Sequence, residues 1–215
     1  MNAILNKYLT GGEAIESADG VLIMIHGRGS NASDIIELSG ELRIDGMAIL
    51  APQAPHNSWY PHSFMAPLVT NQPAIDLSLV ILDELVKYAL SHGITRERIF
   101  FLGFSQGACL VLEYLSRNAG KYGGAVAFTG GLIGEVLEDD NYHGNFSGTR
   151  VLITTGDLDP HVPLVRVKAS VTQMENQQAN VRLEIYMSKS HSILPDEINI
   201  ANDWIFNHQQ VGKII

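Results

Sequence analysis

The sequence predicts a single α/β domain, residues 1–215, with a mostly parallel β-sheet that helices cover on both faces. Short continuous apolar runs, typical of strands buried on both sides, alternate along the chain with segments of helical apolar spacing. One such run, residues 99–102, leads directly into the G-x-S-x-G stretch Gly103–Gly107, and a helical apolar pattern follows. A strand, this motif and a helix in that order indicate a nucleophile elbow with Ser105 at its tip.

Strands are predicted wherever a short apolar run lies between turn residues. The first two are short edge segments around Gly11-Gly12, and the last alternates apolar with polar residues. In chain order the predicted strands are residues 3–11, 14–17, 21–25, 47–50, 99–102, 125–128, 151–155 and 181–187. Because helical segments separate most of them, the sheet is expected to be mostly parallel.

Helices are predicted from apolar residues at helical spacing and from end signals. They are a short helix around residues 35–38, then 74–90, the segment after Ser105, 163–178 and 197–208. Either Asn31 or Ser33 would cap the first helix, and Pro163 would open the fourth. Residues 134–149 and 188–194 are expected to be loops.

The bulk composition excludes several classes of function. A formal net charge of −9 argues against nucleic acid or an anionic membrane surface as a partner. Cys109 is the only cysteine, which excludes an intrachain disulfide. No signal peptide is visible, and no apolar stretch reaches the roughly 20 residues that cross a bilayer. We expect a cytoplasmic protein without stable membrane insertion, and a homodimer remains open.

Residues 52–73 contain five prolines and no apolar periodicity. A loop of this length in a compact domain is usually a functional surface or a disordered segment, and its aromatic residues favour a packed wall. We expect Trp59, Tyr60 and Phe64 to line a substrate pocket beside Ser105, since aromatic rings form a rigid apolar wall. The alternative is that Trp59 only pins the loop to the body of the protein.

Three reactive side chains follow predicted strands, at the sheet edge where α/β proteins bind ligands. They are Ser105, Asp159 and His191, and this chain order is typical of α/β hydrolases. A serine hydroxyl is a poor nucleophile until a base removes its proton, and imidazole changes charge near neutral pH. A carboxylate then orients the imidazole and stabilises its charged form.

The choice of base and acid rests on position. His191 lies in the loop directly after the last predicted strand, whereas the other seven histidines break the chain order, lie too close to the acid or fall in the last helix. Asp159 is preferred to Asp157 as the acid. Asp157 directly follows Gly156 and is expected to accept hydrogen bonds from turn amides.

Two backbone N–H groups are expected to stabilise the tetrahedral intermediate. One belongs to Gln106, which follows the nucleophile and opens a helix. The other belongs to Arg28, in the loop after the strand 21–25, where flanking glycines let the backbone approach a ligand. His26 is expected to order that loop. This chemistry requires neither a cofactor nor a metal.

The chain resembles the phospholipase/carboxylesterase family of α/β-hydrolases, which includes acyl-protein thioesterases and small bacterial carboxylesterases. The motifs that carry the resemblance are His26-Gly27-Arg28-Gly29, Ala51-Pro52, Ser58-Trp59-Tyr60, Gly103–Gly107, residues 156–163 and His191-Ser192. The resemblance implies a Ser105–Asp159–His191 triad, an oxyanion hole at Arg28 and Gln106, and little or no lid.

One position departs from the family pattern. Eukaryotic thioesterases of this family usually have an apolar residue where Arg28 stands, and a cation near the acyl site argues against a long apolar chain. We therefore predict a serine carboxylesterase acting on small-molecule esters. An acyl-protein thioesterase or lysophospholipase acting on longer chains is the enzymatic alternative, and a ligand receptor built on a hydrolase fold is the non-enzymatic one.

Overall fold

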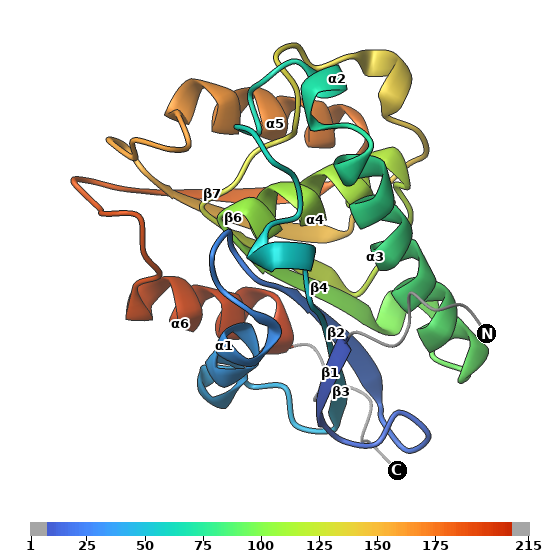
Figure 1. The fold of residues 1–215 in the computed structure, drawn as a ribbon. Helices are drawn as coiled ribbons and strands as arrows, with labels where there is room; N and C mark the ends of the chain where they lie inside the picture. The colour runs from blue at the N-terminus through green and yellow to red at the C-terminus, as the bar shows by residue number, and fades with distance from the viewer. Residues whose placement is uncertain (1–7, 208–215) are drawn as a thin grey trace.

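A computed structural model describes residues 8–207 and has the predicted α/β architecture (Figure 1). Seven strands form one sheet in the order β1-β3-β2-β4-β5-β6-β7, with only the edge strand β1 antiparallel to its neighbour. The strands are β1 (Tyr8–Gly12), β2 (Gly20–Ile25), β3 (Met47–Pro52), β4 (Ile99–Phe104), β5 (Gly124–Phe128), β6 (Arg150–Gly156) and β7 (Asn180–Tyr186).

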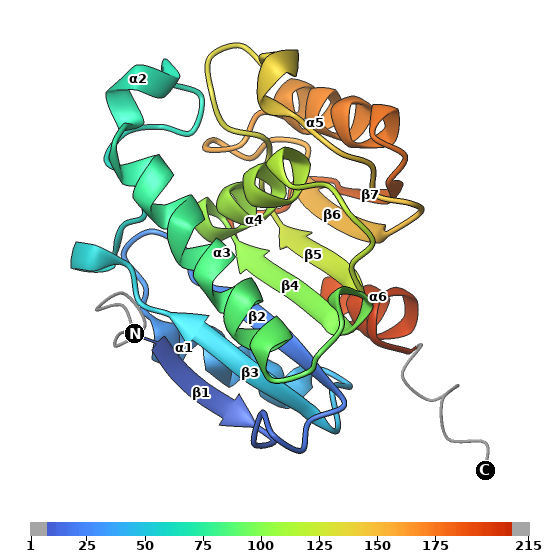
Figure 2. The same ribbon diagram turned by 90° about the vertical axis from the view of Figure 1, so that its right-hand side faces the viewer.

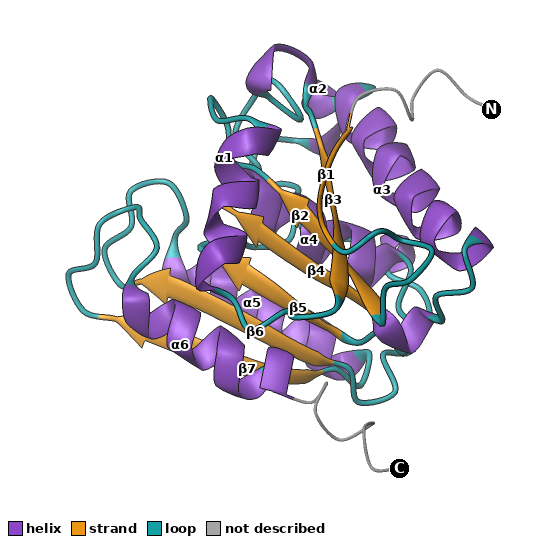
Figure 3. Cartoon of the chain, turned by 90° about the horizontal axis from the view of Figure 1, so that it is seen from below, coloured by secondary structure: helices purple, strands orange, loops and turns teal. Residues whose placement is uncertain are grey.

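Helices cover both faces of the sheet, because successive side chains of each buried strand point to opposite sides. In β2, Val21, Ile23 and Ile25 pack under α3 (Ala74–Ser91), α4 (Gln106–Arg117) and α5 (Leu164–Asn176). Figure 2 shows α3 and α4 in front of the sheet. Leu22 and Met24 face α1 (Ala32–Glu37) and α6 (Pro195–Trp204), the helices seen on the underside in Figure 3.

Two predictions at the N-terminal edge need correction. Residues 14–17 are not a strand, because Ser17 N–H donates to Ala14 O at 3.0 Å and closes a turn. The predicted strand 3–11 is β1 (Tyr8–Gly12), and residues 3–7 lie outside the described residues. Asn31, rather than Ser33, caps α1, since its side chain accepts hydrogen bonds from two backbone amides of the first turn.

The other boundaries differ from prediction by a few residues. The predicted helix 197–208 begins earlier, at Pro195, and His208 lies outside the described residues. The proline-rich segment 52–73 contains a 3₁₀ turn, Pro55–Asn57, and one helical turn, α2 (Leu68–Asn71). Among the described residues no helix is both long and apolar enough to cross a bilayer. The same part of the chain has no separate lid domain above the carboxyl ends of the strands.

Candidate active site

Ser105 lies at the turn between β4 and α4 in a backbone conformation that non-glycine residues rarely adopt, with φ 54° and ψ −117°. The turn is tight because the strand and the helix nearly touch. A Cβ atom at Gly103 would lie 2.5 Å from the carbonyl of Gly107, and one at Gly107 would collide with Ile25 O. The G-x-S-x-G spacing therefore produces the strained turn that raises the Ser105 hydroxyl above the sheet edge.

The structure brings Ser105, His191 and Asp159 into one hydrogen-bonded chain. His191 Nε2 lies 2.7 Å from Ser105 Oγ, and His191 Nδ1 lies 2.7 Å from Asp159 Oδ2. An ionised carboxylate only accepts hydrogen bonds, so Nδ1 carries the ring proton and Nε2 is free to accept the serine proton. This is the arrangement that activates a serine hydroxyl.

Asp159 is held in its charged form. Burial acts to raise the pKa of its carboxyl, but hydrogen bonds from His191 and from the amides of His161 and Val162 outweigh burial and lower the pKa below its usual value. Asp157 lies apart from this chain. Its Oδ1 accepts a hydrogen bond from Ser188 N–H at 2.7 Å and so fixes the start of the loop that carries His191.

The two predicted oxyanion donors border the same cavity as Ser105. Gln106 is the first residue of α4, so its N–H has no partner within the helix. Among the described residues the N–H of Arg28 also has no acceptor. The loop of Arg28 is fixed by His26, whose Nε2 accepts from Ala54 N–H at 3.1 Å while Nδ1 donates to Gly27 O at 2.8 Å. Burial lowers the pKa of His26 and keeps the ring neutral.

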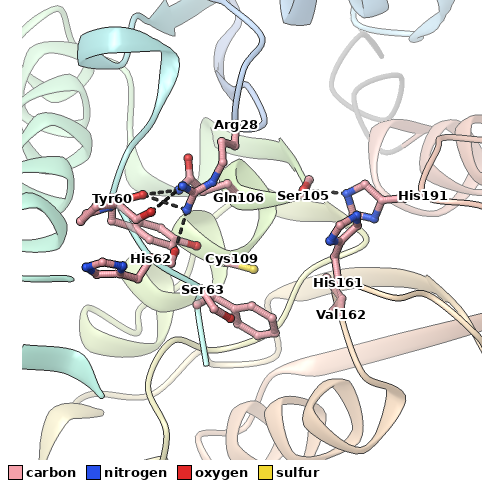
Figure 4. A pocket seen from close by; sticks show the side chains of 12 residues that line it. Arg28, Tyr60, His62, Ser63, Ser105, Gln106, Cys109, His161, Val162 and His191 are labelled. Carbon is pink, nitrogen blue, oxygen red and sulfur yellow. Dashed lines mark hydrogen bonds between the residues drawn. The ribbon is translucent and has the colours of Figure 1, made fainter. Parts of the chain in front are cut away.

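A cavity of about 420 Å³ opens beside Ser105 (Figure 4). Tyr60 and Phe64 line it, as predicted, but Trp59 does not. Trp59 is 1% exposed, and its indole N–H donates to His26 O at 2.8 Å. The prediction that Trp59 forms part of the pocket wall is therefore wrong, because its ring turns inward and pins the proline-rich segment to the body of the protein.

The side chain of Gln106 fixes the same segment. Its Oε1 accepts from Trp59 N–H at 2.9 Å, and its Nε2 donates to Tyr60 O at 2.8 Å. Cys109 also borders the cavity, but burial raises the pKa of its thiol to about 12, so it is an unreactive neutral group. Among residues 8–207 no cluster of three or more potential metal ligands gathers at any point.

The guanidinium of Arg28 crosses the cavity rim and binds three successive carbonyl groups. Its Nη1 donates to Pro61 O at 2.6 Å, and its Nη2 donates to Tyr60 O at 2.9 Å and to His62 O at 2.6 Å. Figure 4 shows this fan of bonds on the side of the cavity opposite His191. The sequence predicted a cation near the acyl site at Arg28 but not this attachment.

Sequence reasoning also missed a buried ion pair that anchors the loop carrying His191. Lys189 Nζ lies 2.5 Å from Glu197 Oε1, and the two side chains are 1% and 0% exposed. Glu197 also accepts hydrogen bonds from the Thr154 hydroxyl and from Leu194 N–H. One carboxylate thus holds both ends of the His191 loop. A lysine in a polar loop gives no sequence signal of such burial.

His161 is a further neighbour that sequence reasoning set aside. Its ring packs edge-on against His191, with ring centroids 4.9 Å apart, and it lines the cavity. Its position two residues after Asp159, whose carboxylate accepts its N–H, was the signal that could have placed it there.

A mostly parallel seven-stranded sheet with a serine at the turn from β4 to α4 defines an α/β hydrolase. The chain belongs to the Phospholipase/Carboxylesterase family, whose sequence model matches residues 12–209.

Similar proteins agree with this assignment. A phospholipase/carboxylesterase from Dyadobacter fermentans has 51% sequence identity and a TM-score of 0.92, over 93% of this chain and 96% of its own. The Bacillus cereus carboxylesterase shares the fold, with a TM-score of 0.75 and 19% identity over 93% of each chain. Acyl-protein thioesterase 1 of Saccharomyces cerevisiae is 32% identical over 56% of this chain, which spans only 54% of the yeast protein.

Proposed function

We propose that this family member is a serine carboxylesterase that cleaves small carboxylic esters through an acyl-enzyme on Ser105. The observation that carries the proposal is the unbroken hydrogen-bonded chain from Ser105 Oγ through His191 to Asp159, at the edge of an open cavity. The Asp159 carboxylate faces His191 Nδ1, which supports Nε2 as the acceptor of the serine proton.

In the proposed mechanism His191 Nε2 takes the proton of Ser105 as Oγ attacks the ester carbonyl carbon. The N–H groups of Arg28 and Gln106 stabilise the negative oxygen that forms. The imidazolium then gives its proton to the departing alcohol oxygen, which leaves the acyl group on Oγ. Water repeats the sequence at the acyl-enzyme, with His191 again accepting and returning the proton.

The cavity favours a short acyl group. Tyr60 and Phe64 bound it with buried rings, and the Arg28 side chain adds a charge to its rim. A methylene that extends beyond the wall gains little of the roughly 0.8 kcal/mol that its burial would provide. We therefore expect acyl groups of about two to six carbons to be the best substrates.

A thioesterase acting on longer acyl chains is the second candidate, because several curated relatives are named acyl-protein thioesterases. The same nucleophile would attack a thioester carbonyl by the same steps. A non-catalytic receptor would bind esters in the cavity without turning them over, and the hydrogen-bonded Ser105 argues against it.

The test is kcat/KM for p-nitrophenyl esters from acetate to palmitate, with a palmitoyl thioester alongside. We expect a maximum at short chains, labelling of the Ser105 peptide by an organophosphate, and a loss of roughly 10³-fold or more in kcat for Ser105→Ala. A maximum of kcat/KM at acyl chains of about ten carbons or longer would favour the thioesterase, because burial of each added methylene group would then still stabilise the bound substrate. Near wild-type turnover by Ser105→Ala would remove this serine from the mechanism.

A further inference from the structure

We propose that the Arg28 guanidinium binds a carboxylate in the acyl part of the substrate, so that the preferred esters are half-esters of short dicarboxylic acids. The inference rests on the proposed esterase function and names its substrate class. It starts from the charge of the cavity. The protein carries 23 acidic and 14 basic residues, yet among the described residues no Asp or Glu lines the cavity, whereas Arg28 does.

Arg28 has no carboxylate partner in the described part of the chain. Within residues 8–207 it forms no ion pair, and its side chain is bound only by the neutral carbonyls of residues 60–62. Carbonyl dipoles orient the guanidinium but leave its full positive charge in place. An anion that enters the cavity would therefore be the first negatively charged partner of the guanidinium.

The guanidinium is held in place before any ligand arrives. Its three hydrogen bonds use three of the five N–H donors, and its carbon lies 5.9 Å from the centroid of the Tyr60 ring. The remaining donors, on Nε and Nη1, are those left for a ligand. Because the carbonyls already restrict the side chain, little rotamer freedom is lost when a carboxylate binds.

The position of His191 indicates which part of the ester carries the charge. In the proposed mechanism His191 protonates the leaving alcohol, so the alcohol lies on the His191 side of the cavity. The acyl chain then extends toward the opposite side, where Figure 4 shows the guanidinium beside Tyr60. The charge therefore belongs at the far end of the acyl chain, a few methylene groups from the carbonyl.

The experiment compares monomethyl glutarate with methyl pentanoate, which have acyl chains of equal length but differ in the terminal carboxylate. Proton release is followed at about pH 8, where histidine is neutral and a carboxylate is charged. Wild-type protein should show a kcat/KM about tenfold higher for the half-ester, the size of one charge-assisted hydrogen bond. The preference should shrink as salt is added.

Arg28→Gln should remove the preference, and Arg28→Lys should keep part of it. The readout is the ratio of the two kcat/KM values, because a disturbed 60–62 segment lowers both alike. Arg43→Gln is the matched control: it removes the same charge from an exposed surface pair with Asp203, outside the cavity, and should leave the ratio unchanged.

Equal kcat/KM for the two esters in wild-type protein would overturn the inference while leaving the esterase function intact. An equal change of the ratio in Arg43→Gln and Arg28→Gln would also overturn it, because net charge would then be the cause. If the protein hydrolyses neither methyl ester and none of the p-nitrophenyl esters, the proposed function is refuted instead.

Discussion

Two of the loops that border the cavity each have a long cationic side chain among their supports. The loop 188–194, which carries His191, is held by Lys189, and the segment 54–64 is held by Arg28. Lys189 is 1% exposed and has the Glu197 carboxylate as its partner. Arg28 lies at the exposed rim and binds only carbonyl groups.

The difference follows from solvation. A fully buried ammonium is stable only beside an opposite charge, so Lys189 and Glu197 form a closed unit whose charges cancel. Arg28 remains partly hydrated and needs no counter-ion. The first loop is thus a fixed support for the imidazole, whereas Arg28, which holds the second loop from the loop after β2, presents an uncompensated charge at the cavity rim.

The largest expected effect concerns Asp159, whose carboxylate is hydrogen-bonded to His191 on the first loop. Asp159→Asn should lower kcat by roughly 10⁴-fold in a folded protein, because an amide favours the wrong imidazole tautomer. Asp157→Asn is the matched control, since Asp157 only anchors Ser188 N–H and should cost about 1 kcal/mol of stability. Ester turnover and urea unfolding of both variants are measured together. A greater loss of kcat in Asp157→Asn would reassign the acid.

A smaller effect concerns Lys189. Lys189→Met leaves the Glu197 carboxylate buried without a counter-charge, which should lower the free energy of unfolding by about 3–5 kcal/mol. Adding Glu197→Gln should restore much of the loss, because the buried charge is then removed. Where the variants fold, kcat should fall more than KM rises, since His191 loses its support.

The matched change on the other loop is Arg28→Gln. It should cost no more than about 1 kcal/mol, because the guanidinium is at the exposed rim. Urea unfolding of the two single variants compares the loops directly. Equal destabilisation would mean that the loops do not differ in the way described.

The two loops should also differ in their sensitivity to acid. Because burial lowers the pKa of His26 in the folded state, its stabilising contribution is complete above the unfolded value of about 6.5 and is lost as the pH falls below it. Asp159 also has a lowered pKa, so its contribution is lost only below about pH 4.

Hydrogen exchange between about pH 7 and 5 measures this difference, in the range where a histidine gains its proton. Protection should fall first in residues 54–64, where Ala54 N–H donates to His26, and should persist in 188–194. Loss of protection in 188–194 at the same pH or earlier would contradict the assignment of His26 as the acid-sensitive support.

The strands and the elbow were predictable because they depend on local sequence. Continuous apolar runs marked the buried strands, and the glycine spacing around Ser105 fixed the turn. The rule that ligands bind beyond the carboxyl ends of parallel strands then brought Asp159 and His191 to the same edge. The strand predicted at residues 14–17 was wrong because a four-residue pattern cannot distinguish an edge strand from a turn.

The supports of the site were not predictable, because their partners are distant or unexpected in kind. Arg28 binds carbonyls more than thirty residues further along the chain, which no periodicity encodes. The burial of Lys189 depends on a helix that follows the loop. Trp59 turns inward, where its indole N–H donates to His26 O and its ring packs in the core, and a proline-rich segment carries no pattern that shows which aromatic ring does so.

The smallest expected effect on catalysis concerns Trp59. Trp59→Phe keeps an aromatic ring but leaves His26 O without its donor, so the free energy of unfolding should fall by about 1 kcal/mol. The preferred acyl length and kcat should stay unchanged, because Trp59 does not line the cavity. Tyr60→Phe is a useful companion, since Tyr60 does line it and its loss of a hydroxyl alters the cavity surface itself. Unfolding in urea and the p-nitrophenyl ester series are measured for both variants. If Trp59→Phe moves the chain-length maximum as much as Tyr60→Phe does, the segment 54–64 is not rigid, and the indole reaches the substrate after all.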